Sequence, residues 1–221
     1  MATGDRVLPW RRQASAPAEE LAPLLASYRS RHPKASVSLV NRAYLTARRA
    51  HQHQVRGSGE SYINHPIAVA KIVADIGLDD VSLAAALLHD AVEDGGVHYA
   101  ERIRTQFGNR VADIVAGCTD GVPDASGSKP PWQARKQSHL DHLKSASDDV
   151  LLVSGSDKLH NARAIVEDLL SIGQRVFDRF SASKEQTLWY YESLAQIFES
   201  RGTPVARALR GAVNEMKRLS N

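Results

Sequence analysis

Apolar residues recur at helical spacing from Ser38 to the last residues of the chain, and this pattern limits the fold more than any other feature. Leu39, Tyr44 and Ala47, for example, follow the period of an α-helix. No run alternates apolar and polar residues for more than a few positions, and no Asn-Gly or Asp-Gly turn lies between β-branched runs. The pattern therefore predicts an all-α fold, a bundle of about eight to ten helices.

Helix ends are marked by capping residues and by glycine. Asp79 or Asp80 can cap a central helix at its start. The pair Gly95-Gly96 ends the same helix. We expect helices over residues 18–29, 37–54, 81–94, 98–107, 109–119, 132–146, 149–170, 183–200 and 204–219, and one more that begins at YINHP, residues 62–66.

The composition excludes several classes of protein. A chain of 221 residues with 43% hydrophobic and 24% charged residues is long enough for one domain with a buried core. Its longest apolar run, Leu83–Leu88, has six residues, far below the roughly 20 needed to span a bilayer. The start, MATGDRVLPWRRQ, has no apolar segment for secretion, and the single cysteine, Cys118, fits a small buried side chain. We therefore expect a cytoplasmic protein with no membrane partner.

The positive charge is concentrated near the N-terminus. The whole chain has a net charge of +3, but residues 1–49 hold nine basic and three acidic residues, so the remainder has a net charge of −3. No basic patch interleaved with aromatic residues occurs in the sequence, which argues against a nucleic-acid partner. We expect residues 1–35 to be a basic, weakly structured appendage with one helix, and residues 36–221 to form the domain.

The central helix carries the strongest indication of a functional site. Leu83–Val92 is apolar on every face except at His89 and Asp90, so this helix should lie in the core. Between Lys71 and Arg102 the chain has seven acidic residues and no Lys or Arg. Because a buried carboxylate without a cation is costly, the pattern indicates that a metal ion supplies the missing charge.

Two further residues extend the His-Asp pair to a set of four metal ligands. His65 lies at a helix start, and Asp157 follows the apolar run 150–153. Two imidazoles and two carboxylates, without sulfur, suit manganese, iron, magnesium or zinc. We favour a single Mn²⁺ ion.

Two more acidic residues point to the same region. Glu93 and Asp94 lie one helical turn beyond the His-Asp pair and are candidates for proton transfer or water orientation. His51 and His53 flank a core helix, and we place them at the surface or behind the ligands. In the alternative interpretation, His89 is a hydrogen-bonded core histidine and the acidic residues only end a helix.

Three stretches of the sequence, RGSGESYINHPIAVA, AAALLHDAVEDG and SDKLHNAR, form an ordered set of motifs. This set resembles that of the HD-domain metal-dependent phosphohydrolases, and within them the hydrolase domain of RelA/SpoT homologues. The resemblance extends over about residues 38–200 and implies a helical bundle around a single metal site. Because the chain ends at residue 221, we expect a stand-alone small alarmone hydrolase without synthetase activity.

The resemblance also implies roles for individual residues. The family's catalytic acidic pair falls on Glu93 and Asp94. Its metal ligands fall on the four residues already identified, His65, His89, Asp90 and Asp157.

The substrate contacts of the family fall on several segments. Its nucleotide-contacting loop corresponds to Arg56 and Ser58, and its nucleoside pocket to Asn161 and Tyr190, although Tyr190 also fits ordinary helix packing. Many relatives have a basic residue where this chain has Gly57, which leaves the nucleotide open.

Basic residues near the predicted site fit the phosphates of a polyanionic substrate. Lys129, Arg135 and Lys136 belong to the segment KPPWQARK, which would otherwise be a solvated face. Lys158 lies next to Asp157. It is better suited to contact a phosphate group or to hold the metal ligands in place than to act as a catalytic base. We expect all four to bind substrate.

The function that the resemblance implies is hydrolysis of guanosine 3′-diphosphate 5′-di(tri)phosphate, (p)ppGpp, to GDP or GTP and pyrophosphate. A metal-activated water would attack the phosphorus bonded to the 3′ oxygen, with Glu93 or Asp94 as acid or base. The alternatives are the same chemistry on (p)ppApp or NADPH, a generic HD nucleotidase or phosphodiesterase, and a non-catalytic metal-bearing binding module. The sequence leaves open whether the chain forms a homo-oligomer.

Overall fold

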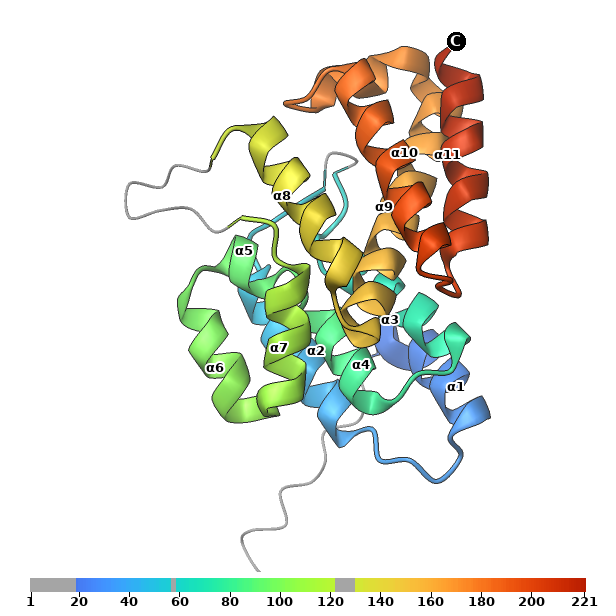
Figure 1. Ribbon diagram of the computed structural model, residues 1–221. Helices are drawn as coiled ribbons and strands as arrows, with labels where there is room; N and C mark the ends of the chain where they lie inside the picture. Colours follow the sequence, from blue (N-terminus) through green and yellow to red (C-terminus); the bar gives the residue numbers. More distant parts are fainter. Residues whose placement is uncertain (1–18, 57–58, 122–129) are drawn as a thin grey trace, which may run out of the picture.

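The computed structural model describes residues 19–56, 59–121 and 130–221 (Figure 1). In this part of the chain, eleven α-helices and two short 3-10 helices follow one another, and the β-bridge between Val55 and Ser61 is isolated. The prediction of an all-α fold is confirmed. The elements are η1 (Glu19–Leu21), α1 (Ala22–Arg31), α2 (Ser38–Ala50), α3 (Asn64–Ile76), α4 (Asp80–Leu88), α5 (Ala91–Gly95), α6 (His98–Phe107), α7 (Asn109–Cys118), α8 (Trp132–Ser145), α9 (Asp148–Ile172), η2 (Gly173–Arg179), α10 (Lys184–Ser200) and α11 (Ala206–Ser220).

Helix α9 joins the two halves of the molecule. It is 25 residues long, and it contacts α3, α4 and α7 as well as α10 and α11. In Figure 1, α1 to α7 occupy the lower half of the view, and α10 and α11 the upper half. A residue in the middle of α9 can therefore meet side chains from both groups of helices.

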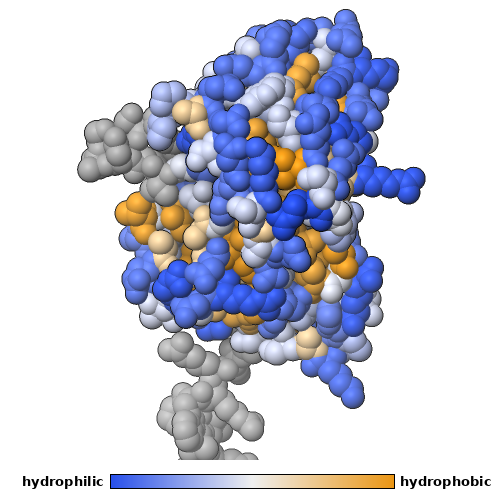
Figure 2. Space-filling model, in the orientation of Figure 1, coloured by the Kyte–Doolittle hydropathy of each residue, from blue (hydrophilic) through white to orange (hydrophobic). Residues whose placement is uncertain are grey.

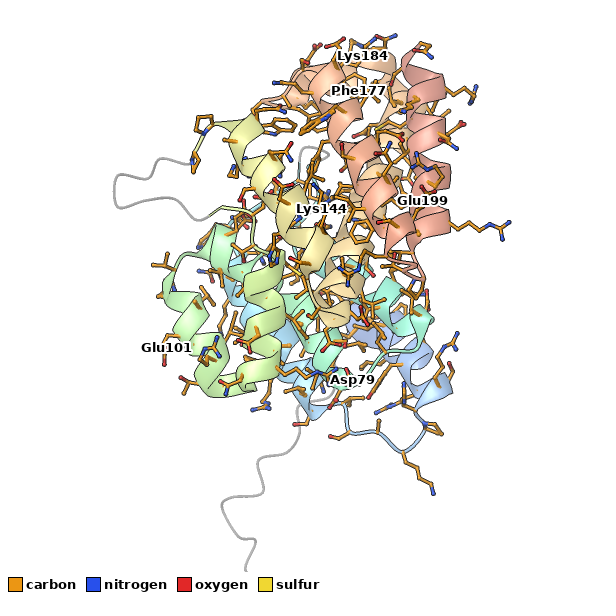
Figure 3. All side chains as sticks on the ribbon, in the orientation of Figure 1. Asp79, Glu101, Lys144, Phe177, Lys184 and Glu199 are labelled. Atoms are coloured by element: carbon orange, nitrogen blue, oxygen red, sulfur yellow. The ribbon has the colours of Figure 1, made fainter. Side chains whose placement is uncertain are left out.

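Helix α4 is the buried centre of the lower half. It packs against α2, α3 and α7, and every side chain from Leu83 to Leu88 is fully buried. Asp79 caps the helix by accepting a hydrogen bond from the backbone N–H of Ser82 at 2.9 Å. Arg110 of α7 pairs with both Asp79, labelled in Figure 3, and Asp149 of α9. This contact ties the starts of α4, α7 and α9 together.

The N-terminal helix differs from the expectation of a weakly structured appendage over residues 1–35. Residues 1–18 lie outside the described residues. In the part that is described, Leu21, Leu24, Leu25 and Tyr28 are buried, and α1 packs on α3. These four positions have the i, i+3, i+4, i+7 spacing of one helical face, and burying that face fixes η1 and α1 on the domain.

The visible face of the molecule is mostly hydrophilic, and its hydrophobic residues lie mainly in the lower half of the view (Figure 2). Charged pairs join neighbouring helices at the surface, as where Arg210 of α11 donates to Glu199 of α10 at 2.9 Å (Figure 3). Within the described residues, no helix combines the length and the apolar character that crossing a bilayer requires.

Gly155 allows α9 to approach the connection between α10 and α11. A Cβ atom on Gly155 would lie 2.6 Å from Val205 Cγ2 and 3.1 Å from Phe198 Cε1. We expect Gly155→Ala to lower the free energy of unfolding by about 1–3 kcal/mol, the usual cost of overpacking. For a domain of this size the melting temperature should fall by about 2–12 °C.

Thermal unfolding followed by circular dichroism in the presence of a chelator measures this effect. The matched control is Gly211→Ala on α11, because no described atom lies within 4 Å of a Cβ at Gly211. Alanine should be neutral there or stabilise the helix by up to about 1 kcal/mol. Equal melting temperatures for the two variants would contradict the close approach at Gly155.

Candidate metal centre

Four side chains from three segments converge between α3, α4 and α9. His65 lies in the first turn of α3, His89 and Asp90 lie between α4 and α5, and Asp157 lies in the middle of α9. The two imidazoles and Asp157 are buried, and the side chain of Asp90 is 20% exposed. The structure thus brings together the four residues that the sequence suggested as metal ligands.

Donor atoms of His65, His89 and Asp157, all within 4.8 Å of one another, surround a common point, and Asp90 Oδ2 contacts both imidazoles beside it. His65 Nε2 lies 3.1 Å from Asp157 Oδ1 and 3.4 Å from Asp90 Oδ2. His89 Nε2 lies 3.1 Å from Asp90 Oδ2 and 3.6 Å from Asp157 Oδ1. Donor atoms that share one divalent ion at about 2.0–2.2 Å have mutual distances of this kind.

The central helix is divided into two elements at the His-Asp pair. The sequence predicted one helix over residues 81–94, but α4 ends at Leu88 and α5 begins at Ala91. Consecutive side chains on a regular helix do not face each other. Here the backbone stays close to helical, with φ −57° and ψ −35° at His89 and φ −94° and ψ −6° at Asp90, and yet His89 Nε2 and Asp90 Oδ2 lie 3.1 Å apart.

The hydrogen bonds of His89 leave one nitrogen for a metal ion. Its Nδ1 lies 2.8 Å from the carbonyl oxygen of Ala86, so this nitrogen carries the proton and donates it. The other nitrogen, Nε2, is buried and has no hydrogen-bond partner among the described residues. A neutral imidazole with a free Nε2 lone pair beside two carboxylates fits a divalent cation.

Both carboxylates of the centre favour the ionised form. Burial acts to raise the pKa of Asp90, but the adjacent imidazoles of His89 and His65 outweigh it and hold the pKa well below its usual range. Burial likewise opposes ionisation of Asp157, and the ammonium of Lys158 outweighs it and keeps the pKa of Asp157 low. The centre therefore carries the negative charge that a cation requires.

Tyr62 forms a hydrogen bond with one of the four residues, and His51 packs on Tyr62. The hydroxyl of Tyr62 donates to Asp90 Oδ2 at 2.8 Å, and burial, followed by the charge of Asp90, raises the pKa of Tyr62. His51 is buried and stacks on Tyr62 with the ring centroids 4.7 Å apart, whereas His53 is exposed. Tyr62 was not among the residues expected at the site, although its place three residues before His65 could have indicated it.

A polar cavity of about 220 Å³ lies beside the four residues. Glu93 and Asp94 line it, as do Asp90 and Asp157. Burial, then the charges of Asp90 and Glu93, raise the pKa of Asp94, so that its protonated form persists to higher pH than usual. The expected acidic pair thus shares one cavity with the centre.

Arg135 and Lys136 of α8 both bind Asp120, and Lys136 and Asp120 line this cavity. Both donate to Asp120, which lies just after α7, with Arg135 Nη1 at 2.5 Å. Lys136 Nζ also lies 5.0 Å from the centroid of the Tyr190 ring. Burial opposes ionisation of Asp120, but Lys136 outweighs it and lowers the pKa of Asp120 to about 2. No sequence pattern indicated Asp120, because this contact joins segments that only the fold brings together.

A chain of hydrogen bonds connects Arg56 to the centre. Arg56 Nη2 donates to Asn161 Oδ1 at 2.9 Å, and Asn161 Nδ2 donates to Asp157 Oδ1 at 2.6 Å. Lys158 Nζ donates to the other oxygen of Asp157 at 2.7 Å. Three of the expected substrate-binding residues therefore lie within one or two hydrogen bonds of the centre.

Tyr190 packs against a neighbouring aromatic ring and also lines a cavity. Its ring meets Trp132 edge-on at a centroid distance of 6.0 Å, and it lines a cavity of about 380 Å³. Its hydroxyl is buried without a hydrogen-bond partner among the described residues. Ser58 and Lys129, expected to bind substrate, lie outside the described residues.

The cavities meet at Asn161. This residue lines the cavity at the centre, the cavity at Tyr190, and a third cavity of about 560 Å³ that also touches Arg56 and His160. Lys136 and Lys158 line both of the first two cavities. A ligand with a phosphate group near the centre and a larger nucleoside part beyond Asn161 fits this arrangement.

The family model of the HD domain matches residues 43–188. The chain therefore belongs to the HD domain family. His65, His89, Asp90 and Asp157 all lie within the matched residues.

Several known proteins are similar to this chain. A probable GTP pyrophosphokinase of Mycobacterium leprae is 38% identical over 145 residues, which are 66% of this chain and 18% of that protein. A guanosine-3′,5′-bis(diphosphate) 3′-pyrophosphohydrolase of Escherichia coli O157:H7 is 34% identical over 179 residues, 80% of this chain and 24% of that protein. The structure of a metazoan orthologue of SpoT that hydrolyses ppGpp has a TM-score of 0.65 at 26% identity and covers 85% of this chain and 99% of its own.

The two bacterial relatives are much longer than the segment that they share with this chain. The shared segment is 18% of the M. leprae protein and 24% of the E. coli protein. The sequence similarity therefore covers only one part of each bacterial relative. The metazoan structure, by contrast, matches over nearly its whole length.

Proposed function

We propose that this chain hydrolyses the 3′-diphosphate of (p)ppGpp to GDP or GTP and pyrophosphate, with one Mn²⁺ ion as cofactor. The observation that carries the proposal is the set of two histidines and two aspartates around one point, with an acidic pair and basic residues facing the same cavity. The E. coli relative is named for this reaction, and the metazoan structure belongs to a protein that hydrolyses ppGpp.

The ion would be held by His65, His89, Asp90 and Asp157. Their nitrogen and oxygen donors suit manganese better than a structural zinc, which prefers thiolates. When bound, the ion supplies Lewis-acid polarisation of a phosphoryl oxygen and lowers the pKa of a water molecule. Tyr62, through its hydrogen bond to Asp90, orients one of the four ligands.

The acidic pair would move the protons of the reaction. Asp94 lines the cavity at the centre, and we assign to it the donation of a proton to the leaving 3′ oxygen. Glu93 lines the same cavity and would accept a proton from the attacking water. The bond from phosphorus to the 3′ oxygen breaks, and the bond from phosphorus to the water oxygen forms.

The remaining residues would bind the nucleotide. Lys136 and Lys158 line the cavity at the centre and the cavity at Tyr190, where they would contact phosphate oxygens. Arg56 and Asn161 would hold the nucleoside, and their hydrogen bond aligns them with the centre. Arg135, Ser58, Lys129 and Tyr190 complete the proposed set of substrate contacts.

A substrate panel tests this function. Protein that has been stripped of metal and reloaded with Mn²⁺ is incubated with ppGpp, pppGpp, ppApp and NADPH, and the products are separated by chromatography. We expect manganese-dependent release of pyrophosphate with GDP from ppGpp and with GTP from pppGpp. Absence of turnover with the whole panel, while metal is bound, would contradict the proposal.

The second candidate is the same chemistry on an adenine nucleotide. The feature that favours it is Gly57, because the family resemblance implies a basic residue at this position. Turnover of ppApp or NADPH but not of ppGpp in the same panel would select this candidate. A cytoplasmic location, where such nucleotides occur, is part of either proposal.

A further inference from the structure

The imidazole ring of a second histidine, His160, lies next to that of His65. His65 Nδ1 lies 2.9 Å from Nδ1 of His160, and the two ring centroids are 4.9 Å apart. His160 belongs to α9 and lies three residues after Asp157. It lines the cavity of about 560 Å³ and not the cavity at the centre, so it faces His65 from the outer side.

The hydrogen bond between the two imidazoles requires one nitrogen to carry a proton and the other to offer a lone pair. Nε2 of His65 points to Asp90 and Asp157 at the centre. An Nε2 that binds a cation leaves the proton of His65 on Nδ1. His160 Nδ1 is then the acceptor.

The local backbone explains why His65 needs a partner from another helix. His89 donates its Nδ1 proton to a carbonyl of its own helix, that of Ala86. His65 lies in the first turn of α3, and the corresponding carbonyl, that of Tyr62, accepts the backbone N–H of His65 at 2.9 Å. The side chain of His160 is thus the partner of His65 Nδ1, as a backbone carbonyl is the partner of His89 Nδ1.

We propose that His160 is a positioning residue for the metal centre, which accepts the Nδ1 proton of His65 and keeps its Nε2 directed at the ion. The inference rests on the proposed metal site. One helix, α9, then supplies both a ligand, Asp157, and the support of a second ligand, His65, so that the spacing of three residues along α9 fixes their relative positions. Partners of this kind are worth about 10–100-fold in metal affinity.

Two substitutions of nearly equal size separate the hydrogen bond from packing. In His160→Asn the amide oxygen occupies the position of Nδ1 and can still accept the proton of His65. His160→Leu has a similar shape and offers no acceptor. The dissociation constant for Mn²⁺ is measured by isothermal titration calorimetry on each metal-stripped full chain, and the melting temperature in chelator reports whether the metal-free fold is intact.

We expect His160→Leu to bind Mn²⁺ about 10–100-fold more weakly than the wild type and His160→Asn to remain within a few-fold of it. The melting temperatures in chelator should be similar. Saturating Mn²⁺ should restore much of the turnover number of His160→Leu. Equal affinities for all three proteins, or equal loss in both variants, would overturn the inference.

The result also separates this inference from the function on which it rests. A wild type that binds no Mn²⁺ would contradict the metal site and the role of His160 together. A wild type that binds Mn²⁺ with unchanged affinity in His160→Leu would contradict the role of His160 alone. A raised KM for nucleotide without a change in metal affinity would make His160 a substrate contact instead and would also overturn the inference.

Discussion

Replacement of His89 by alanine is expected to abolish metal binding and turnover together. His89 is 2% exposed, and its Nε2 has no other hydrogen-bond partner among the described residues. Without this nitrogen the remaining donors come from His65, Asp90 and Asp157. Loss of several kcal/mol of transition-state stabilisation by the ion corresponds to a fall of about 10³-fold or more in the rate.

Metal-linked stability gives an independent measurement of the same loss. At 100 times its dissociation constant, Mn²⁺ should stabilise the wild type by about 2.7 kcal/mol. For a chain of this length the melting temperature should rise by about 5–11 °C. His89→Ala should show no such rise.

The matched control is His53→Ala, because His53 is exposed. This variant should keep the metal-dependent rise in melting temperature and the activity of the wild type. Comparison of the variants in chelator shows whether His89→Ala is folded. A folded His89→Ala protein that still gains stability from Mn²⁺ would contradict the assignment of His89 as a ligand.

The second large effect is expected for Glu93→Gln, which should bind Mn²⁺ normally but turn over about 10²- to 10⁴-fold more slowly. Glu93 lines the cavity at the centre but is not one of the four residues around the common point. Glutamine keeps the size of the side chain and removes its ability to accept a proton. The change should therefore affect kcat rather than metal affinity.

Single-turnover kinetics with ppGpp and calorimetric titration of Mn²⁺ measure the two quantities separately. Glu101→Gln is the matched control, because Glu101, labelled in Figure 3, is exposed on α6 and does not line the cavity at the centre. It should behave as the wild type does. A rate in Glu93→Gln close to that of the wild type would rule out a proton-transfer role for Glu93.

Much of the helical structure follows from local signals. The expected ends at 98–107 and 183–200 agree with α6 and, within one residue, with α10. Gly108 ends α6 with a positive φ of 87°, and Ser183 begins α10 with a capping box. Signals of this kind act within one turn of the chain, which is why the sequence was sufficient to locate them.

The sequence also indicated the four candidate ligands, since a His-Asp pair in an apolar helix without nearby cations requires compensation of its charge. It did not indicate the interruption between α4 and α5, because the apolar pattern continues through residues 83–92. The regular apolar face of residues 19–31 was underestimated, because the first 35 residues as a whole are rich in Pro, Ala and Arg.

The sequence by itself determined the helical class, most helix ends and the residue types able to hold a cation, because these depend on period, capping and charge within short segments. Only the tertiary structure decided which atoms meet. The hydrogen bond from Tyr62 to Asp90, that between His65 and His160, and the pairing of Asp120 with Arg135 join residues that are 28, 95 and 15 positions apart. Such contacts arise from the packing of helices around α4 and α9, and no local pattern encodes them.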